Sequence, residues 1–345
     1  MISMVFDSFT VGMVAVAIVA GIGLTKLFEK NETDATKSLP VPVPPAGSRF
    51  VVLPMSKVKL RYSDSRTPGD SKKAKGVTFV MLHGFAGCLE TWKFLTSQLT
   101  EKSPDCRVIS LDLVGSGYSD KPNGEDFDYS YRNQGKIVME FLSALALTKV
   151  VLVGHSSGTV VAAAAALQCP SKVVGTIFVA NALFRAKSNL FSNPWLKSLF
   201  GWMAGKMTAD RKKSLSRMHH KDHIDRVLTD DFVQEFAAPT LLPNFHTALV
   251  ETIVAKEPPY EDLVDALLLS SPLPILFVYG KDDAYKPLPS EQAASMKKKL
   301  EAMDQELLAK VLLDTVELEK CAHYAQHEQP EALAEAILNF VRKHV

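Results

Sequence analysis

The sequence predicts an α/β fold in which a doubly wound, mostly parallel sheet carries a helical lid insertion and follows an apolar N-terminal helix. Three observations support this prediction. Strand-like apolar runs alternate with helix-like segments over most of the 345 residues. The strand-like runs are almost continuously apolar, which is typical of parallel strands buried on both faces. One long stretch, 183–270, contains helix-like patterns and no strand-like run.

The strand-like runs are short and rich in β-branched residues. They are VTFVMLH (77–83), RVISLDL (107–113), KVVLVG (149–154), KVVGTIFVA (172–180), PILFVYG (274–280) and KVLLDTVELE (310–319). Helix-like segments lie between them, at 89–100, 131–147, 157–168, 290–308 and 330–344. This alternation predicts parallel strands with helices on both faces. Residues 50–64 alternate in polarity and predict an antiparallel hairpin at the sheet edge.

The stretch 183–270 is too long to be a bare loop. We expect it to form a helical lid over the carboxyl ends of the strands, where open α/β folds bind their ligands. The lid would divide the folded body into a first half at 49–182 and a second half at 271–345.

The N-terminal segment 1–30 contains eighteen uncharged residues at 8–25. As a helix they would be roughly 27 Å long, close to the thickness of the hydrocarbon core of a bilayer. A cleaved signal peptide is the alternative, but Asp7 and the lack of a preceding Lys or Arg favour a single-pass anchor. Lys26 and Lys30 follow the segment, which favours a cytosolic location for the rest of the chain. Residues 31–48 are polar and proline-rich and predict an extended linker.

Composition excludes several classes of protein. With 47% hydrophobic residues the chain can bury a large core, so it is not a disordered protein. Lys and Arg (39) nearly balance Asp and Glu (38), so no overall charge draws the chain to nucleic acid. The four cysteines are far apart and show no zinc-ligand spacing, so they do not predict a zinc site. The sequence implies no metal and no organic cofactor.

The motif GHSSG (154–158) directly follows one strand-like run and precedes a helix-like run of small residues. A serine at a sharp strand-to-helix turn needs tiny neighbours, and Gly154 and Gly158 meet that need. The turn would present Ser156 as a nucleophile. The backbone N–H of Ser157, at the start of the helix, would then stabilise an oxyanion.

A serine nucleophile needs a base, and the base needs a carboxylate to orient it. Asp282 and Asp283 follow the strand at 274–280, and His323 follows the strand at 310–319, so acid and base come after the nucleophile in the expected chain order. His327 is a second candidate for the base. Of the two histidines, His323 comes directly after the small Ala322 at the strand end.

The loop after the strand at 77–83 should supply the second oxyanion donor. It contains His83, Gly84 and Phe85, and Gly84 would let the backbone come close to the nucleophile. The N–H of Phe85 is the candidate donor. We interpret His83 and His155 as supporting residues that shape the two turns.

These motifs together resemble the α/β-hydrolase superfamily over about 50–345, apart from the insertion. The motifs are HGF (83–85), DLVGSGYSDKP (112–122), GHSSG (154–158), YGKDD (279–283) and AHYAQHEQP (322–330). The resemblance implies a Ser-His-acid triad and selects Asp283, three residues after the glycine that ends its strand. Some relatives carry the acid after the preceding strand, but Asn181 occupies that position here.

The first two motifs are most similar to the epoxide-hydrolase and haloalkane-dehalogenase branch, whose nucleophile is an aspartate. This chain has Ser156 at that position, so the resemblance implies acyl rather than alkyl chemistry. The proline that usually follows the HG-aromatic step is replaced by Ala86.

The lid sequence is locally basic. Between Leu183 and Arg226 ten Lys and Arg residues stand against three Asp, together with five Phe and Trp residues. Such a surface suits contact with an anionic membrane. The alternative is that apolar residues of this stretch line an acyl pocket or pack on the body.

The sequence therefore predicts a membrane-anchored serine hydrolase that cleaves carboxylic esters with a lipophilic part. Ser156, His323 and Asp283 would form its triad, and Phe85 and Ser157 its oxyanion hole. Two further uses of the triad stay open, namely acyl transfer to an alcohol and hydrolysis of a carbon–carbon bond. A receptor that senses a small lipophilic ligand with little turnover is the alternative outside the enzymes.

Overall fold

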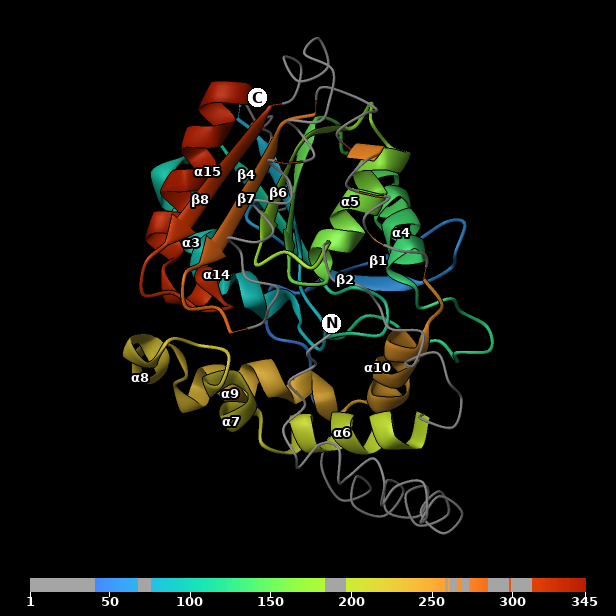
Figure 1. The fold of residues 1–345 in the computed structure, drawn as a ribbon. Coiled ribbons are helices and arrows are strands. Elements are labelled where there is room, and N and C mark those ends of the chain that lie inside the picture. The colour runs from blue at the N-terminus through green and yellow to red at the C-terminus, as the bar shows by residue number, and fades with distance from the viewer. Residues whose placement is uncertain are drawn as a thin grey trace.

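In a computed structural model, residues 41–67, 76–183, 197–257, 260, 263, 266, 267, 273–284, 298 and 312–345 are described. Within them the chain forms one mixed sheet in the order β1-β2-β4-β3-β5-β6-β7-β8 (Figure 1). The strands are β1 (Arg49–Val52), β2 (Lys59–Asp64), β3 (Thr78–Leu82), β4 (Arg107–Leu111), β5 (Val150–His155), β6 (Val173–Val179), β7 (Ile275–Gly280) and β8 (Leu313–Leu318).

The strand directions follow the polarity patterns of the sequence. β3 to β8 pair in parallel, and each runs within its predicted apolar stretch or one residue beyond it. β1 and β2 form the predicted antiparallel hairpin, with Phe50 opposite Arg61, and β2 joins the sheet antiparallel to β4. A hairpin can occupy this edge because its strands need only one buried face.

Helices cover both faces of the sheet (Figure 1). α4 (Tyr131–Ala144) and α5 (Gly158–Gln168) pack together on one face, and α3 (Lys93–Lys102) and α15 (Pro330–His344) pack together on the other. Short elements precede two of them, η1 (Leu89–Trp92) before α3 and α14 (Ala325–Glu328) before α15. This arrangement confirms the predicted doubly wound architecture.

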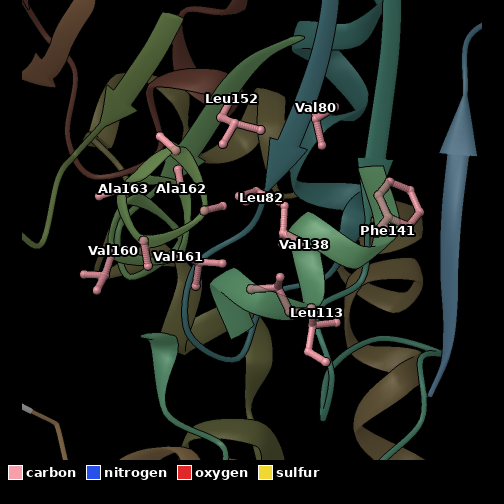
Figure 2. Packing of buried hydrophobic residues seen from close by; sticks show 14 of the residues in the cluster. Val80, Leu82, Leu113, Val138, Phe141, Leu152, Val160, Val161, Ala162 and Ala163 are labelled. Atoms are coloured by element: carbon pink, nitrogen blue, oxygen red, sulfur yellow. The ribbon is translucent and has the colours of Figure 1, made fainter. Parts of the chain in front are cut away.

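Successive side chains of β3 point to opposite faces of the sheet and so belong to two separate layers of the core. Val80 and Leu82 pack with Leu152 and the α4–α5 pair, as Figure 2 shows, whereas Phe79 and Met81 pack against α3 and α15. All five residues of β3 are buried, which is the reason for its unbroken apolar sequence.

The α4–α5 pair packs closely because its contact residues are small. A Cβ atom on Gly135 of α4 would lie 2.7 Å from the Cβ of Ala164 on α5. The alanine run at 162–166 is fully buried at this contact. Close packing here holds α5 against the sheet and so orients the helix that begins beside Ser156.

The described helices between β6 and β7 form a group beyond the carboxyl ends of the parallel strands, which we call the cap (Figure 1). In the described residues 197–257 its elements are α6 (Lys197–Ala209), α7 (Arg211–Ser216), η4 (Lys221–His223), α8 (Ile224–Val227), α9 (Asp230–Ala237), η5 (Ala238–Leu241) and α10 (Phe245–Val254). These residues contain no strand, in keeping with the predicted helical lid. The domain boundaries at 49, 183 and 271 stay predictions.

The predicted membrane location is corrected by the structure. No helix in the described part of the chain is long and apolar enough to cross a membrane. The apolar segment 1–30 lies outside the described residues, as do most of the linker 31–48 and all but one residue of the expected helix 290–308. The prediction depended on the length of an apolar run and on the charges beside it, which do not establish a membrane span.

Candidate active site

Ser156 lies at the turn between β5 and α5. Its backbone has φ 51°, in the left-handed region that a non-glycine residue enters only when its surroundings impose it. The turn is held by a 2.9 Å hydrogen bond from Ser156 N–H to the Val179 carbonyl and a 3.0 Å bond from Thr159 N–H to the Ser156 carbonyl. Ser156 is half-buried and directly follows β5, at the carboxyl end of that strand.

Three glycines let the backbone pack tightly around this turn. A Cβ on Gly154 would lie 2.5 Å from the Gly158 oxygen, and a Cβ on Gly158 would lie 2.4 Å from the Leu82 oxygen. A Cβ on Gly84 would lie 2.9 Å from the Cβ of Ser156. Both glycines of the motif, and the glycine of the HGF loop, are therefore required by close approach.

His323 and Asp283 meet at the same edge. The Nδ1 atom of His323 lies 2.8 Å from Oδ2 of Asp283, and both side chains are buried. An Nδ1–H donated to a carboxylate leaves Nε2 as the basic nitrogen. Asp282 points elsewhere, with its carboxylate 3.8 Å from Nε2 of His220 and about half exposed to solvent.

The two predicted oxyanion donors line one pocket. Its walls include Gly84, Phe85 and Ala86 from the loop after β3, Ser157 from the start of α5, and Leu113. Ala86, which replaces the usual proline, has φ 53°.

His83 braces the loops on one side of this pocket. Its Nδ1–H donates to the Gly84 carbonyl at 2.8 Å, and its Nε2 accepts from Leu113 N–H at 3.0 Å. Burial lowers the pKa of His83 to about 4, so the ring is neutral at pH 7. A neutral ring with both nitrogens engaged joins the loops after β3 and β4.

His155 braces the other side of the site. Its Nε2 lies 2.9 Å from the backbone oxygen of His323. Burial lowers the pKa of His155 well below its ordinary value, and the nearby His323 lowers it further. The ring is therefore a neutral donor that supports the His323 loop.

His327, the second candidate for the base, contacts other groups. Its Nε2 lies 3.0 Å from the Thr91 oxygen and its Nδ1 lies 3.1 Å from Nε2 of His219. The ring stacks on Tyr324, with centroids 4.7 Å apart. Of the two histidines, His323 is the one bonded to Asp283.

Glu328 is a functional candidate that sequence reasoning missed. Its buried carboxylate accepts from the N–H groups on both sides of His323, at 3.0 Å from Ala322 and 3.1 Å from Tyr324. It also accepts from the cap, at 2.8 Å from His220 N–H. A glutamate at the end of a short helix, here α14, carries no sequence signal that its side chain turns back onto the preceding loop.

The cap also contacts the His323 loop through its backbone. His323 N–H donates to the Met218 carbonyl at 3.0 Å, and the Arg226 guanidinium donates to the Glu328 carbonyl. The position of His323 thus depends on the insertion as well as on β8.

Two further observations concern residues around this site. The Asn181 side chain accepts from Leu183 N–H at 3.0 Å, which is a local turn contact. Within the described residues no group of three His, Cys, Asp or Glu side chains could hold a metal ion.

The family model described as "Alpha/beta hydrolase family" matches residues 79–336, about three quarters of the chain. The chain belongs to the α/β-hydrolase family. This match confirms the resemblance noted from the motifs. In its general class, the chain is a hydrolase of the α/β-hydrolase family.

The curated relatives of this α/β hydrolase differ in activity. It is 26% identical over 298 residues to the uncharacterized hydrolase YugF of Bacillus subtilis, covering 83% of this chain and 95% of that protein. It is 25% identical over 277 residues to the 1-acylglycerol-3-phosphate O-acyltransferase ABHD5 of Mus musculus, covering 73% of each.

Solved structures share the α/β-hydrolase fold. An esterase from Thermogutta terrifontis matches with a TM-score of 0.62 and 21% identity, over 87% of this chain and 100% of the other. The epoxide hydrolase CorEH matches with a TM-score of 0.61 and 19% identity, over 86% and 98%. At these identities the likeness concerns the fold alone.

Proposed function

We propose that this α/β hydrolase is a serine hydrolase that cleaves carboxylic esters with a lipophilic part. The observation that carries the proposal is the 2.8 Å contact between His323 and Asp283 at the sheet edge that also presents Ser156 on a strained turn. A nucleophile, a base and an orienting acid are the minimum set for acyl transfer through a serine.

In the proposed reaction, Ser156 Oγ attacks the ester carbonyl while His323 Nε2 takes the hydroxyl proton. The N–H groups of Phe85 and Ser157 stabilise the oxyanion. Collapse of the tetrahedral intermediate breaks the bond to the alcohol, which leaves with the proton from His323. Water, deprotonated by His323, then attacks the acyl-enzyme and releases the acid, and the proton returns to Ser156.

Apolar side chains in part of the pocket lining support a lipophilic substrate. Leu113, Val114 and Leu249 line the pocket beside the predicted oxyanion hole. Leu249 and Ala86 also pack with Phe245 of the cap in one apolar cluster. An acyl or alkyl chain entering between sheet and cap would meet these side chains.

A second candidate function is acyl transfer to an alcohol, which the match to an acyltransferase favours. The acyl-enzyme is the same, and only the acceptor differs. Product analysis with a competing alcohol separates the two: an acyltransferase forms the new ester at alcohol concentrations far below that of water, whereas a hydrolase releases free acid.

The test of the proposed function is labelling of the full chain by a fluorophosphonate, which reacts with activated serines. We expect the wild type to label and Ser156→Ala not to label. Ser157→Ala is the matched control, because it removes the neighbouring hydroxyl and keeps the backbone N–H. Labelling that persists in Ser156→Ala, or a wild type that never labels, would overturn the assignment.

A further inference from the structure

Arg211 is a buried cation in the cap, beside the candidate active site. It begins α7, which Figure 1 shows next to α9 in the cap, and its side chain is only 5% exposed. The guanidinium donates from Nη2 to the Ala86 carbonyl, and its Cζ lies 4.9 Å from the centre of the Phe236 ring. The buried Nε has no hydrogen-bond partner.

No carboxylate compensates this charge within the described residues. The neighbouring Asp210 accepts from Lys213 N–H and caps α7. In the described part of the chain, the ionisable side chains that interact electrostatically with Arg211 are those of Tyr324 and Cys88. Burial raises the pKa of the Cys88 thiol, and a tyrosine is also neutral at pH 7, so neither supplies a negative charge.

A guanidinium stays protonated even when it is buried, so burial without a counter-ion costs free energy. Burial lowers the pKa of Arg211, in agreement with this cost. A fork of N–H donors matches the oxygens of a carboxylate or a phosphate. A buried guanidinium without a carboxylate partner is suited to bind the anionic group of a ligand.

The position of Arg211 connects it to the site. Ala86, its carbonyl partner, lines the same pocket as Phe85 and Ser157. Tyr324, which interacts electrostatically with the guanidinium, directly follows His323. The cation thus lies between the predicted oxyanion loop and the loop of the proposed base.

We propose that Arg211 binds an oxyanionic group, a carboxylate or a phosphate, carried by the ester substrate. This inference rests on the proposed ester hydrolysis and narrows its substrate class. The substrate would combine a lipophilic chain with one anionic group near the scissile ester.

The test compares four esters of similar length with wild type and Arg211→Gln. Butyl octanoate is neutral. The octanoyl esters of 4-hydroxybutyrate and of 3-hydroxypropyl phosphate are charged on the alcohol side, and monobutyl suberate on the acyl side. Gln can still donate to Ala86. We expect kcat/KM to fall roughly 30- to 1,000-fold for the preferred anionic ester and less than about threefold for the neutral one. Whether a carboxylate or a phosphate ester responds identifies the anion.

Lys212→Gln is the matched control, because the neighbouring lysine forms an exposed ion pair with Asp230 at 2.7 Å. We expect no change in the ratio of anionic to neutral turnover for this variant. An equal loss on all four esters in Arg211→Gln would show that Arg211 only supports the Ala86 loop, and an unchanged anionic turnover would show that it binds no substrate anion. Either result overturns the proposal.

A binding measurement separates this proposal from the proposed function. Butyl phosphate and butyrate should each be tested for raising the unfolding temperature of Ser156→Ala, and of the same variant with Arg211→Gln. If no ester is hydrolysed, the proposed function is refuted. A rise in unfolding temperature that requires Arg211 would still establish the anion site. If neither anion raises the unfolding temperature and no anionic ester is preferred, the anion site fails while neutral ester hydrolysis can stand.

Discussion

The turn of Ser156 and the loop of His323 lie at the same edge of the sheet but are held in different ways. Around Ser156 the backbone itself is packed, and Gly154, Gly158 and Gly84 leave no room for a further carbon. Around His323 the backbone is held by polar groups from distant parts of the chain, including Glu328 and the cap. The first region combines two backbone hydrogen bonds with a tight steric fit, whereas the second depends on polar contacts from distant residues, so different substitutions should disrupt each.

The largest effect on turnover is expected from the acid of the His323 region. Asp283→Asn keeps the shape but favours the wrong imidazole tautomer, so kcat should fall about 10⁴-fold. Asp282→Asn is the matched control and should change kcat less than about threefold. The measurement is steady-state hydrolysis of a neutral ester. A larger loss in Asp282→Asn would assign the acid to the other aspartate.

The Ser156 region should respond most strongly to added volume. Gly158→Ala places a Cβ 2.4 Å from the Leu82 oxygen, so the turn must distort. We expect fluorophosphonate labelling to be lost and the free energy of unfolding to fall by about 3 kcal/mol. Gly205→Ala in α6 is the control, because the added carbon has no neighbour within 4 Å apart from the adjacent residues and the backbone of its own helix. It should stabilise the fold by up to about 1 kcal/mol, since alanine favours a helix. Normal labelling of Gly158→Ala would refute the steric account.

The His323 region should instead respond to lost acceptors. In Glu328→Gln an amide NH2 replaces one oxygen and faces backbone N–H donors, so we expect a loss of about 1–3 kcal/mol of stability. If Glu328 positions His323, kcat should fall roughly 10- to 100-fold with little change in KM. Glu331→Gln is the control, since that side chain is 71% exposed. Unaltered kcat for the folded variant would limit Glu328 to a structural role.

The smallest effect at neutral pH concerns the buried neutral histidine of the HGF loop. The pKa of His83 is about 4 in the folded chain and about 6.5 when unfolded. Between these two pH values the unfolded state binds more protons than the folded state. The contribution of neutral His83 to the free energy of unfolding is therefore fully present above pH 6.5 and is lost as the pH drops toward 4, by on the order of 3 kcal/mol. Urea unfolding at pH 7 and pH 5 measures this slope. His83→Gln should reduce it, and an unchanged slope in this variant would exclude His83 as its source.

Much of the fold and the motifs of the candidate site could be predicted because they depend on local patterns. Continuous apolar runs located the six predicted strands of β3 to β8, and the helix expected at 330–344 begins and ends at those residues. GHSSG could be recognised because the sharp turn at Ser156 requires both of its glycines, and all these residues lie within five positions of the chain. By contrast, an apolar run at 1–30 was predicted to span a membrane, and the structure corrects the resulting location.

The sequence by itself predicted the sheet, the sharp turn at Ser156 and the chain order of the proposed nucleophile, acid and base, because periodicity and small-residue spacing act between neighbours in the chain. Only the tertiary structure decided what holds the His323 loop and where the charge of Arg211 lies. Glu328 acts by folding back onto a loop, and Arg211 reaches Ala86 across 125 positions of chain. Contacts of this kind depend on which surfaces the fold brings together, and no local pattern records them.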